Sequence, residues 1–240
     1  MNEHCRSDRW PEEDEVLASE RKTSLTEVSQ LMGVVEIEQP ETTRLVLGPD
    51  LAGTLMTPGE FHDADEVDED FRYELIHGVL VVTPPPLEEE RGPNEELGVL
   101  LHLYRMQHPQ GSALDDTLSE QHVSTHDSSR RADRVIWAGL GRAPNPRKDL
   151  PTIVVEFVSE GKRNRLRDYH EKRAEYLAAG VREYWIIDRF ARTLTACRSD
   201  RPDVEIPHDG TYQTPLLPGF DLPLARLLAV ADRWRASKES

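Results

Sequence analysis

The hydrophobic pattern of the chain predicts strands and helices in alternation. The runs that suit strands are rich in β-branched or aromatic residues and are found at 71–83, 117–124, 133–138, 152–158, 181–188 and 193–198. Uninterrupted apolar runs such as 153–155 and 184–187 are typical of strands that are covered on both faces. The first run contains Gly78 and therefore predicts either a strand pair or one bent strand.

Two longer segments have the period of an amphipathic helix. The apolar residues of the first, 94–107, recur at i, i+3, i+4 and i+7, and the second runs from about 167 to 179 and stops at Gly180. A shorter helix is expected after Thr57, because Pro58 and Glu60 complete a capping-box start. The tail 219–229 predicts an edge strand or a small closing helix. This order indicates an α/β domain with a mixed central β-sheet flanked by α-helices.

The acidic residues are concentrated at the front of the chain. The net charge is −16, and residues 1–70 hold 19 Asp and Glu against 5 Lys and Arg, whereas residues 130–173 hold 12 Lys and Arg against 6 Asp and Glu. A net negative charge argues against a nucleic-acid partner, but the local basic stretch keeps one possible. We expect a poorly ordered acidic extension over 1–42, with at most a short helix at 24–32, and a single domain over 43–240.

The composition also bears on location and redox chemistry. No apolar run reaches the length of a membrane span, and the first residues lack a secretory signal, so we expect a cytoplasmic protein without a membrane partner. Cys5 and Cys197 are far apart and show no CxxC spacing. Both are expected to be free thiols.

Carboxylates at the ends of predicted strands are the first candidates for chemistry. Asp133 starts one strand and Glu156 ends another, while Glu74 interrupts an apolar strand. Carboxylate oxygens are the ligands that Mg²⁺ and Mn²⁺ prefer, so the three could form a metal site. Glu156 could instead pair with a cation of the basic loop that follows it, whose phosphate-contact candidates are Lys162, Arg163, Arg165 and Arg167.

Lys172 is the second kind of candidate. At 100° per residue it shares one side of its helix with Tyr169 and Tyr176, and that side should face the sheet. An ammonium that reaches the carboxylates could orient a water molecule and stabilise charge on a phosphoryl group. The simpler alternative is that its stem passes the two tyrosines and its charge stays in water.

Three motifs occur in succession along the chain, RYELIHGVLVV, RADRVIW and IVVEFVSEGKRNRLRDYHEKRAEYLAAGVREYWIID, with PGF near the end. In combination they resemble the Uma-two family, a branch of the PD-(D/E)xK nuclease superfamily, and the resemblance covers about residues 52–228. It implies a restriction-endonuclease-like core. It further implies that Asp133 and Glu156 are the metal-binding acids, that Phe157 lends a backbone carbonyl, and that Glu74 is an auxiliary ligand or orients water.

Two positions depart from the superfamily pattern. Val158 stands where the lysine usually follows the glutamate, so the resemblance makes Lys172 the candidate for that lysine. Ala132 replaces the proline that usually precedes the aspartate, a change in a turn-shaping residue. The resulting hypothesis is a Mg²⁺-dependent endonuclease that acts on DNA, with Mn²⁺ as a substitute, and a homodimer if it cuts both strands. The alternative is a nuclease-fold protein that binds nucleic acid or a protein partner without cutting.

Overall fold

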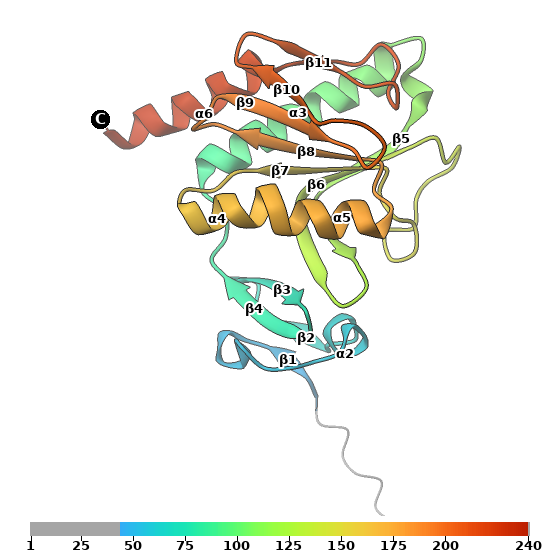
Figure 1. Cartoon of the computed structure of the whole chain (residues 1–240). Coiled ribbons are helices and arrows are strands. Elements are labelled where there is room, and N and C mark those ends of the chain that lie inside the picture. The colour runs from blue at the N-terminus through green and yellow to red at the C-terminus, as the bar shows by residue number, and fades with distance from the viewer. Residues whose placement is uncertain (1–43, 240) are drawn as a thin grey trace, which may run out of the picture. The chain divides into compact units, whose positions relative to one another are not determined.

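The computed structural model describes residues 44–239, and their framework is an eight-stranded mixed sheet (Figure 1). Its strands are Arg72–Ile76 (β3), Val79–Thr83 (β4), Leu114–Ser124 (β5), Ser129–Ala138 (β6), Ile153–Phe157 (β7), Glu183–Asp188 (β8), Thr193–Cys197 (β9) and Val204–Pro207 (β10). Seven of them follow the order β10-β9-β8-β7-β6-β3-β4, and β5 pairs with β6 beside that path. Only β7 and β8 run parallel among these neighbouring strands of the described residues.

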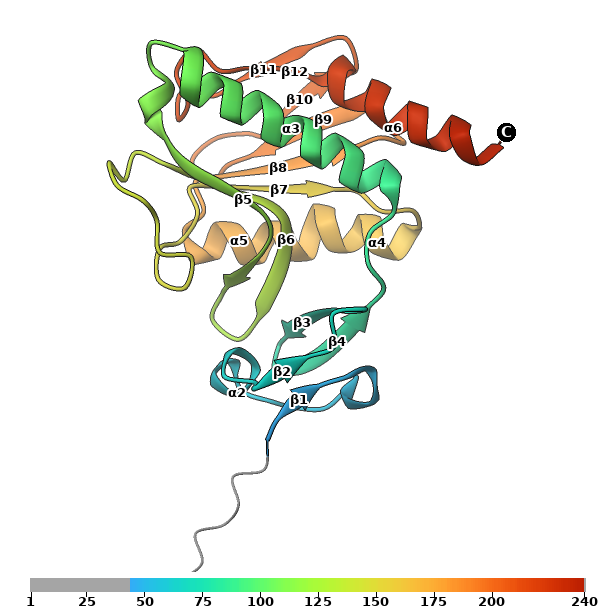
Figure 2. The ribbon, with the colours of Figure 1, turned by 180° about the vertical axis from the view of Figure 1, so that it is seen from behind.

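Helices cover both faces of this sheet, which confirms the predicted α/β architecture. Figure 2 shows α3 (Glu88–Gln107) and α6 (Leu224–Glu239) on the near face. The opposite face carries a continuous rod made of α4 (Lys162–Leu166), η3 (Arg167–Lys172) and α5 (Arg173–Ala179). The sheet is therefore the middle layer of three, and its central strands are buried on both sides, as their uninterrupted apolar sequences predict.

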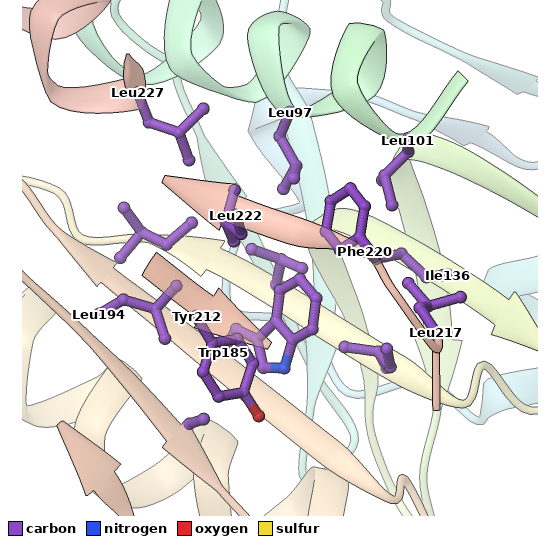
Figure 3. Packing of buried hydrophobic residues seen from close by; sticks show 14 of the residues in the cluster. Leu97, Leu101, Ile136, Trp185, Leu194, Tyr212, Leu217, Phe220, Leu222 and Leu227 are labelled. Carbon is purple, nitrogen blue, oxygen red and sulfur yellow. The ribbon is translucent and has the colours of Figure 1, made fainter. Parts of the chain in front are cut away.

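Two apolar clusters hold these layers together. On the α3 side, Leu97 and Leu101 pack with Trp185 of β8 and Leu227 of α6 (Figure 3). On the α5 side, Tyr176 packs in a cluster with β7 and β8 side chains. Each such buried side chain contributes about 1.5–3 kcal/mol relative to an exposed one. The two clusters fix both the sheet and the helical rod that carries Lys172.

A smaller group of strands and helices precedes the eight-stranded sheet in the chain. It contains the parallel strands β1 (Val46–Leu47) and β2 (Glu66–Val67), the turn η1 (Pro49–Leu51) and the helix α2 (Pro58–His62). The predicted capping box is confirmed, because the Glu60 N–H donates to Thr57 Oγ1 at 3.2 Å and the Thr57 N–H donates to Glu60 Oε2 at 2.7 Å. The hairpin of β3 and β4 turns at His77 and Gly78, both at positive φ.

Several element boundaries differ from the predicted ones. Helix α3 begins at Glu88 rather than at 94, because three glutamates suit its first turn, and it continues through Pro93 in its second turn. The helical rod begins at Lys162 rather than at 167; its N-cap, Gly161, offers no side-chain cap, so the sequence carries no start signal there. The rod does end at Gly180, which has φ 104° as a C-cap glycine should.

The structure also adds elements that the hydrophobic pattern does not reveal. These are η2 (Gly111–Ala113), β10, and the paired strands β11 (Thr211–Gln213) and β12 (Asp221–Pro223). The tail that was predicted as a strand or a helix contains both, since β12 leads directly into α6. None of the helices in the described part of the chain combines the length and apolar character that a membrane crossing requires.

Some sequence predictions concern residues that the structure does not describe. The acidic extension over 1–42, the short helix at 24–32 and the thiol of Cys5 lie outside the described residues. Residues 44–240 group as one compact unit. Cys197, the other cysteine, is a free and buried thiol, as predicted.

Candidate active site

The candidate residues gather where the sheet splits. Strand β6 pairs with β7 over Arg134–Ile136 and with β3 through Ser129, so the two partners diverge from the segment between these contacts. Two carboxylates bridge this fork. Asp133 Oδ2 accepts the Phe157 N–H at 2.7 Å, and Glu74 Oε1 accepts the Arg131 N–H at 2.9 Å. Side-chain oxygens thus replace strand carbonyls as partners of these backbone donors.

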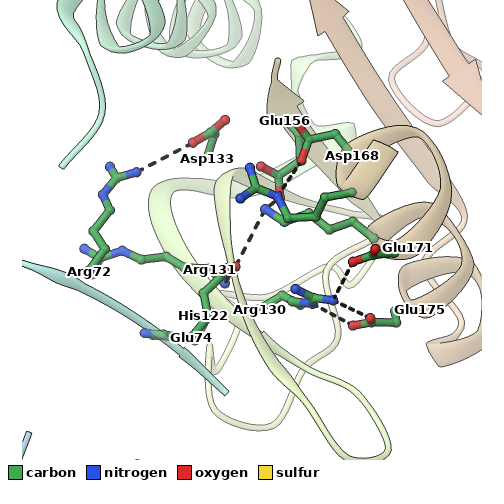
Figure 4. Close-up of polar contacts among 12 residues, drawn as sticks. Arg72, Glu74, His122, Arg130, Arg131, Asp133, Glu156, Asp168, Glu171 and Glu175 are labelled. Carbon is green, nitrogen blue, oxygen red and sulfur yellow. Dashed lines mark hydrogen bonds and ion pairs between the residues drawn. The ribbon is translucent and has the colours of Figure 1, made fainter. Parts of the chain in front are cut away.

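The position of Asp133 in its strand was predicted wrongly. It lies in the middle of the ten-residue strand β6, not at a strand start, because the polar residues from Ser129 onward continue the strand. Its side chain is 15% exposed and faces the fork, where Arg72 Nη1 lies 4.0 Å from its Oδ1 (Figure 4). The fork, rather than the end of a strand, therefore makes this carboxylate accessible.

Glu156 is almost completely buried, at 3% exposure, and has two partners on the helical rod. Lys172 Nζ donates to its Oε1 at 2.8 Å, and the Tyr176 hydroxyl donates to the same oxygen at 3.0 Å. Lys172 Nζ also lies 3.7 Å from Glu74 Oε1. The predicted inward orientation of Lys172 is thus what the structure has, and the snorkelling alternative does not describe its ammonium.

The rod reaches the carboxylates through one turn of π-helix. This turn, η3, contains the buried residues Asp168 and Lys172, and Tyr176 follows four residues later on α5. Asp168 accepts from Arg167 Nε at 3.1 Å. Mid-helix π turns are rare and are often found at functional sites. Here the turn lies against the carboxylates of the fork.

The cations around the site only partly offset the negative charge of Asp133. Burial and the nearby Glu156 raise the pKa of Asp133 well above its usual range, against the opposing effect of Lys172. Burial also raises the pKa of Glu156. Burial acts on Glu74 in the same direction, but Lys172 and Arg130 lower its pKa below the ordinary value. For Lys172, burial disfavours the charge, yet Glu156 and Glu74 raise its pKa, so the ammonium stays protonated.

A cleft of about 420 Å³ opens onto these groups. Asp133, Glu156, Lys172 and Glu74 line it together. Cationic side chains on its wall are Arg72, Arg131 and Arg167, and the three prolines 84–86 form part of its rim. The structure therefore brings all four sequence candidates to one opening that a substrate could enter.

The four basic residues predicted to contact phosphate do not lie at one site. Arg167 lines the cleft, whereas Lys162 and Arg165 line a separate cavity of about 750 Å³ between the rod and β9. Arg165 is paired with Asp188, and Arg163 is exposed. These residues were expected in a loop beside the carboxylates; because Lys162–Leu166 is helical, the residues point to different sides. Only Arg167 of the four lies among the residues around the cleft.

Other residues of the site were not selected from the sequence. Arg72 and Arg131 lie on the cleft wall, and Tyr176 holds Glu156. Arg130 is fully buried, and its Nε and Nη2 donate to Glu175 at 2.8 and 2.5 Å, which ties β6 to α5 (Figure 4). An arginine pair before an aspartate was visible in the sequence. Of these two side chains, Arg130 is buried against Glu175 and Arg131 lines the cleft. The hydrophobic pattern of the sequence did not show which of the two would line the cleft.

The donor set fits a hard divalent cation held by few protein ligands. No group of three or more His, Cys, Asp or Glu side chains with metal-site geometry occurs within residues 44–239. Glu74 therefore does not form a three-ligand group with Asp133 and Glu156. Mg²⁺ commonly binds through one or two carboxylates and keeps several waters. Asp133 and Glu156 meet that requirement, and the raised pKa of Asp133 marks the negative charge that a cation would offset.

Comparisons with known proteins concern the family and the fold of the chain. A family model named Uma2 and described as "Putative restriction endonuclease" matches residues 58–225. A crystal structure described as that of a "putative nuclease belonging to DUF820" from Anabaena variabilis is similar to this chain with a TM-score of 0.59 and 18% identity. The similarity covers 73% of this chain and 99% of that one, and at this identity it concerns the fold. No curated protein matches the chain.

Proposed function

The chain belongs to the Uma2 family of restriction-endonuclease-like proteins, and we propose that it is a Mg²⁺-dependent endonuclease that hydrolyses phosphodiester bonds of DNA. The observation that carries this proposal is the meeting of Asp133, Glu156 and Lys172 in one cleft at the fork of the sheet. Two acids can hold a metal ion for phosphodiester hydrolysis, and one inward cation can stabilise the charge that develops in it.

In this proposal the two acids hold the metal. Asp133 would supply Oδ1, since its Oδ2 already accepts the Phe157 N–H, and Glu156 would supply Oε2, since its Oε1 accepts from Lys172 and Tyr176. The Phe157 backbone carbonyl is the third candidate donor. A bound Mg²⁺ polarises a phosphoryl oxygen and lowers the pKa of a water molecule. Mn²⁺ has the same ligand preference and should substitute.

Lys172 acts as a fixed positive charge. Its pKa is raised by Glu156 and Glu74 in spite of its burial, so it cannot serve as a base near neutral pH. Instead its ammonium orients the attacking water and stabilises the charge that develops on the phosphoryl oxygens. Glu74 also pairs with the ammonium and can orient the same water. Arg167, on the cleft wall, is placed to contact a phosphate of the substrate.

The test is cleavage of supercoiled plasmid by the purified protein with Mg²⁺, Mn²⁺ or EDTA. The wild type should nick the plasmid only with a metal, and Asp133→Asn, Glu156→Gln and Lys172→Met should each lower the rate about 100-fold or more. Asp209→Asn, which removes an exposed carboxylate, is the matched control and should retain the rate. The proposal fails if neither metal supports cleavage, or if cleavage is indifferent to the changes at Asp133 and Glu156.

Metal binding separates this proposal from a fold that binds without cutting. Titration with Mn²⁺, followed by calorimetry, should show a site in the wild type that Asp133→Asn abolishes. A protein that binds DNA but no Mn²⁺ would instead be the non-catalytic alternative. Cleavage of both strands would need two such sites, so we also propose a homodimer, which light scattering on the eluted protein would test.

A further inference from the structure

A second group of charged residues lies beside the cleft, on three strands. Arg72 of β3 and Arg131 of β6 both pair with Glu120 of β5. Arg131 Nε donates to Glu120 Oε2 at 3.1 Å, and Arg72 Nη2 contacts the same oxygen. The three side chains are 18–29% exposed, so solvent reaches all of them. One carboxylate oxygen thus holds two guanidinium groups at the cleft wall.

The backbone at Glu120 is unusual. Its φ is 56°, a left-handed conformation that residues other than glycine rarely adopt. The strand pairs on either side are regular, Ser119 with Arg134 and Gln121 with Ala132, so Glu120 lies opposite Asp133 in the sheet. Left-handed non-glycine residues are concentrated at ligand sites and switch regions. This conformation puts the Glu120 carboxylate within reach of both arginines.

The arginines also connect two cavities. Both line the cleft that contains Asp133, and both line an adjoining cavity of about 450 Å³ that also includes Arg91 and Glu120. Arg72 Nη1 lies 4.0 Å from Asp133 Oδ1. A phosphate held by Arg72 and Arg131 would therefore lie next to the proposed metal ligand. The DNA strand that continues from this phosphate could follow the adjoining cavity toward Arg91.

We propose that Arg72 and Arg131 bind a DNA phosphate that neighbours the cleaved one, and that Glu120 occupies their guanidinium groups until DNA displaces it. The inference rests on the proposed function, because it names how the same cleft holds its substrate. Carboxylate and phosphate bind arginine with the same bidentate geometry, so one can replace the other. The three side chains are partly exposed, so a phosphate can reach the guanidinium groups where they meet the carboxylate.

The alternative is that Glu120 only fastens β3 and β6 to β5. Binding measurements separate the two, using a short fluorescein-labelled DNA duplex in EDTA at low salt, read by fluorescence anisotropy. Glu120→Gln removes the negative charge that holds both arginines and should tighten binding about threefold or more. Arg131→Ala should weaken it about fivefold and lower the slope of log K against log salt by about 1. Asp200→Asn removes a carboxylate from an exposed arginine pair elsewhere and should change affinity by less than about twofold.

A double-mutant comparison excludes a general charge effect. In an Arg72→Ala and Arg131→Ala background, Glu120→Gln should no longer tighten binding, whereas a long-range effect of one lost negative charge would persist. An unchanged affinity of Glu120→Gln, or an equal gain from Asp200→Asn, overturns the inference. If Glu120→Gln does not fold, Arg131→Ala tests the same site, because the Arg131 side chain is partly exposed. If Arg131→Ala binds DNA as tightly as the wild type, the inference also fails.

The failure of this inference is distinct from failure of the proposed function. A wild type that cuts plasmid, but whose Glu120 and Arg131 variants bind the duplex unchanged, contradicts only the phosphate site. A wild type that neither cuts DNA nor binds the duplex at low salt contradicts the proposed function and removes this inference with it.

Discussion

Replacing Asp133 by asparagine should stabilise the protein near neutral pH, although the residue is proposed to be essential. Burial and Glu156 raise the pKa of Asp133, so the folded protein binds this proton more tightly than the unfolded chain does. The stability that the group contributes is complete below its unfolded pKa, about 3.9, and is lost as the pH rises through the folded value. Asparagine keeps an oxygen for the Phe157 N–H and carries no charge to desolvate.

The size of this effect follows from linkage. Each pKa unit by which Asp133 is raised corresponds to about 1.4 kcal/mol. For a domain of this size, about 1 kcal/mol moves Tm by about 2–4 °C. Because the pKa of Asp133 lies well above its ordinary value, we expect Asp133→Asn to raise Tm by several degrees above about pH 7, a gain that fades toward about pH 4.

Calorimetric Tm values from about pH 4 to 8 in EDTA provide the measurement, with Asp209→Asn as the exposed control. The reasoning is refuted if Asp133→Asn melts at or below the wild type at every pH, since Asp133 would then be well solvated or well paired. Adding Mn²⁺ should raise Tm of the wild type and not of Asp133→Asn. A ligand at a hundredfold its Kd contributes about 2.7 kcal/mol of such stabilisation.

Three further predictions concern the structure around the site. Lys172→Met leaves buried carboxylates without their cation and should lower the free energy of unfolding in urea by about 3–5 kcal/mol; a loss below about 1 kcal/mol would mean that the pair is solvated. Gly98→Ala should cost about 1–3 kcal/mol in the same assay, because the new Cβ would lie 2.8 Å from Arg134 Nη2; unchanged stability would show that the arginine moves freely. Burial raises the pKa of Cys197 to about 11, so in a Cys5→Ser background its thiol should react with a disulfide reagent at about pH 8 only after unfolding. Rapid reaction of the folded protein would contradict that burial.

The sequence predicted those parts of the fold in which one period dominates. The apolar runs that became β7 and β8 read as buried strands because both of their faces are covered. Lys172 was placed correctly on the inner face of its helix, because the tyrosine four residues away keeps the same phase. Such features depend on neighbours within a few positions along the chain.

The fork of the sheet could not be predicted in this way. It depends on where β3 and β7 leave β6, and strand divergence leaves no local pattern. The polar start of β6 resembles a loop, although Arg130 is fully buried there against Glu175. The pairing of Arg131 with Glu120 likewise joins strands whose register the sequence does not fix. The sequence indicated which kinds of side chain form the site. Which side chains contact one another was known only from the tertiary structure.

The π turn at Arg167–Lys172 has a consequence for how relatives should be compared. Asp168, Lys172 and Tyr176 are spaced by four, and in an uninterrupted α-helix the first and last would differ by about 80° around the axis. The wider turn absorbs part of that rotation, so all three reach the buried side. Deleting one residue within the turn would restore a regular helix and leave the preceding basic residues near their present side of the rod, because the wider turn accommodates one extra residue. Alignments of this helix with relatives that lack the turn should therefore contain a one-residue gap, and the lysine should be matched from the glycine cap backward.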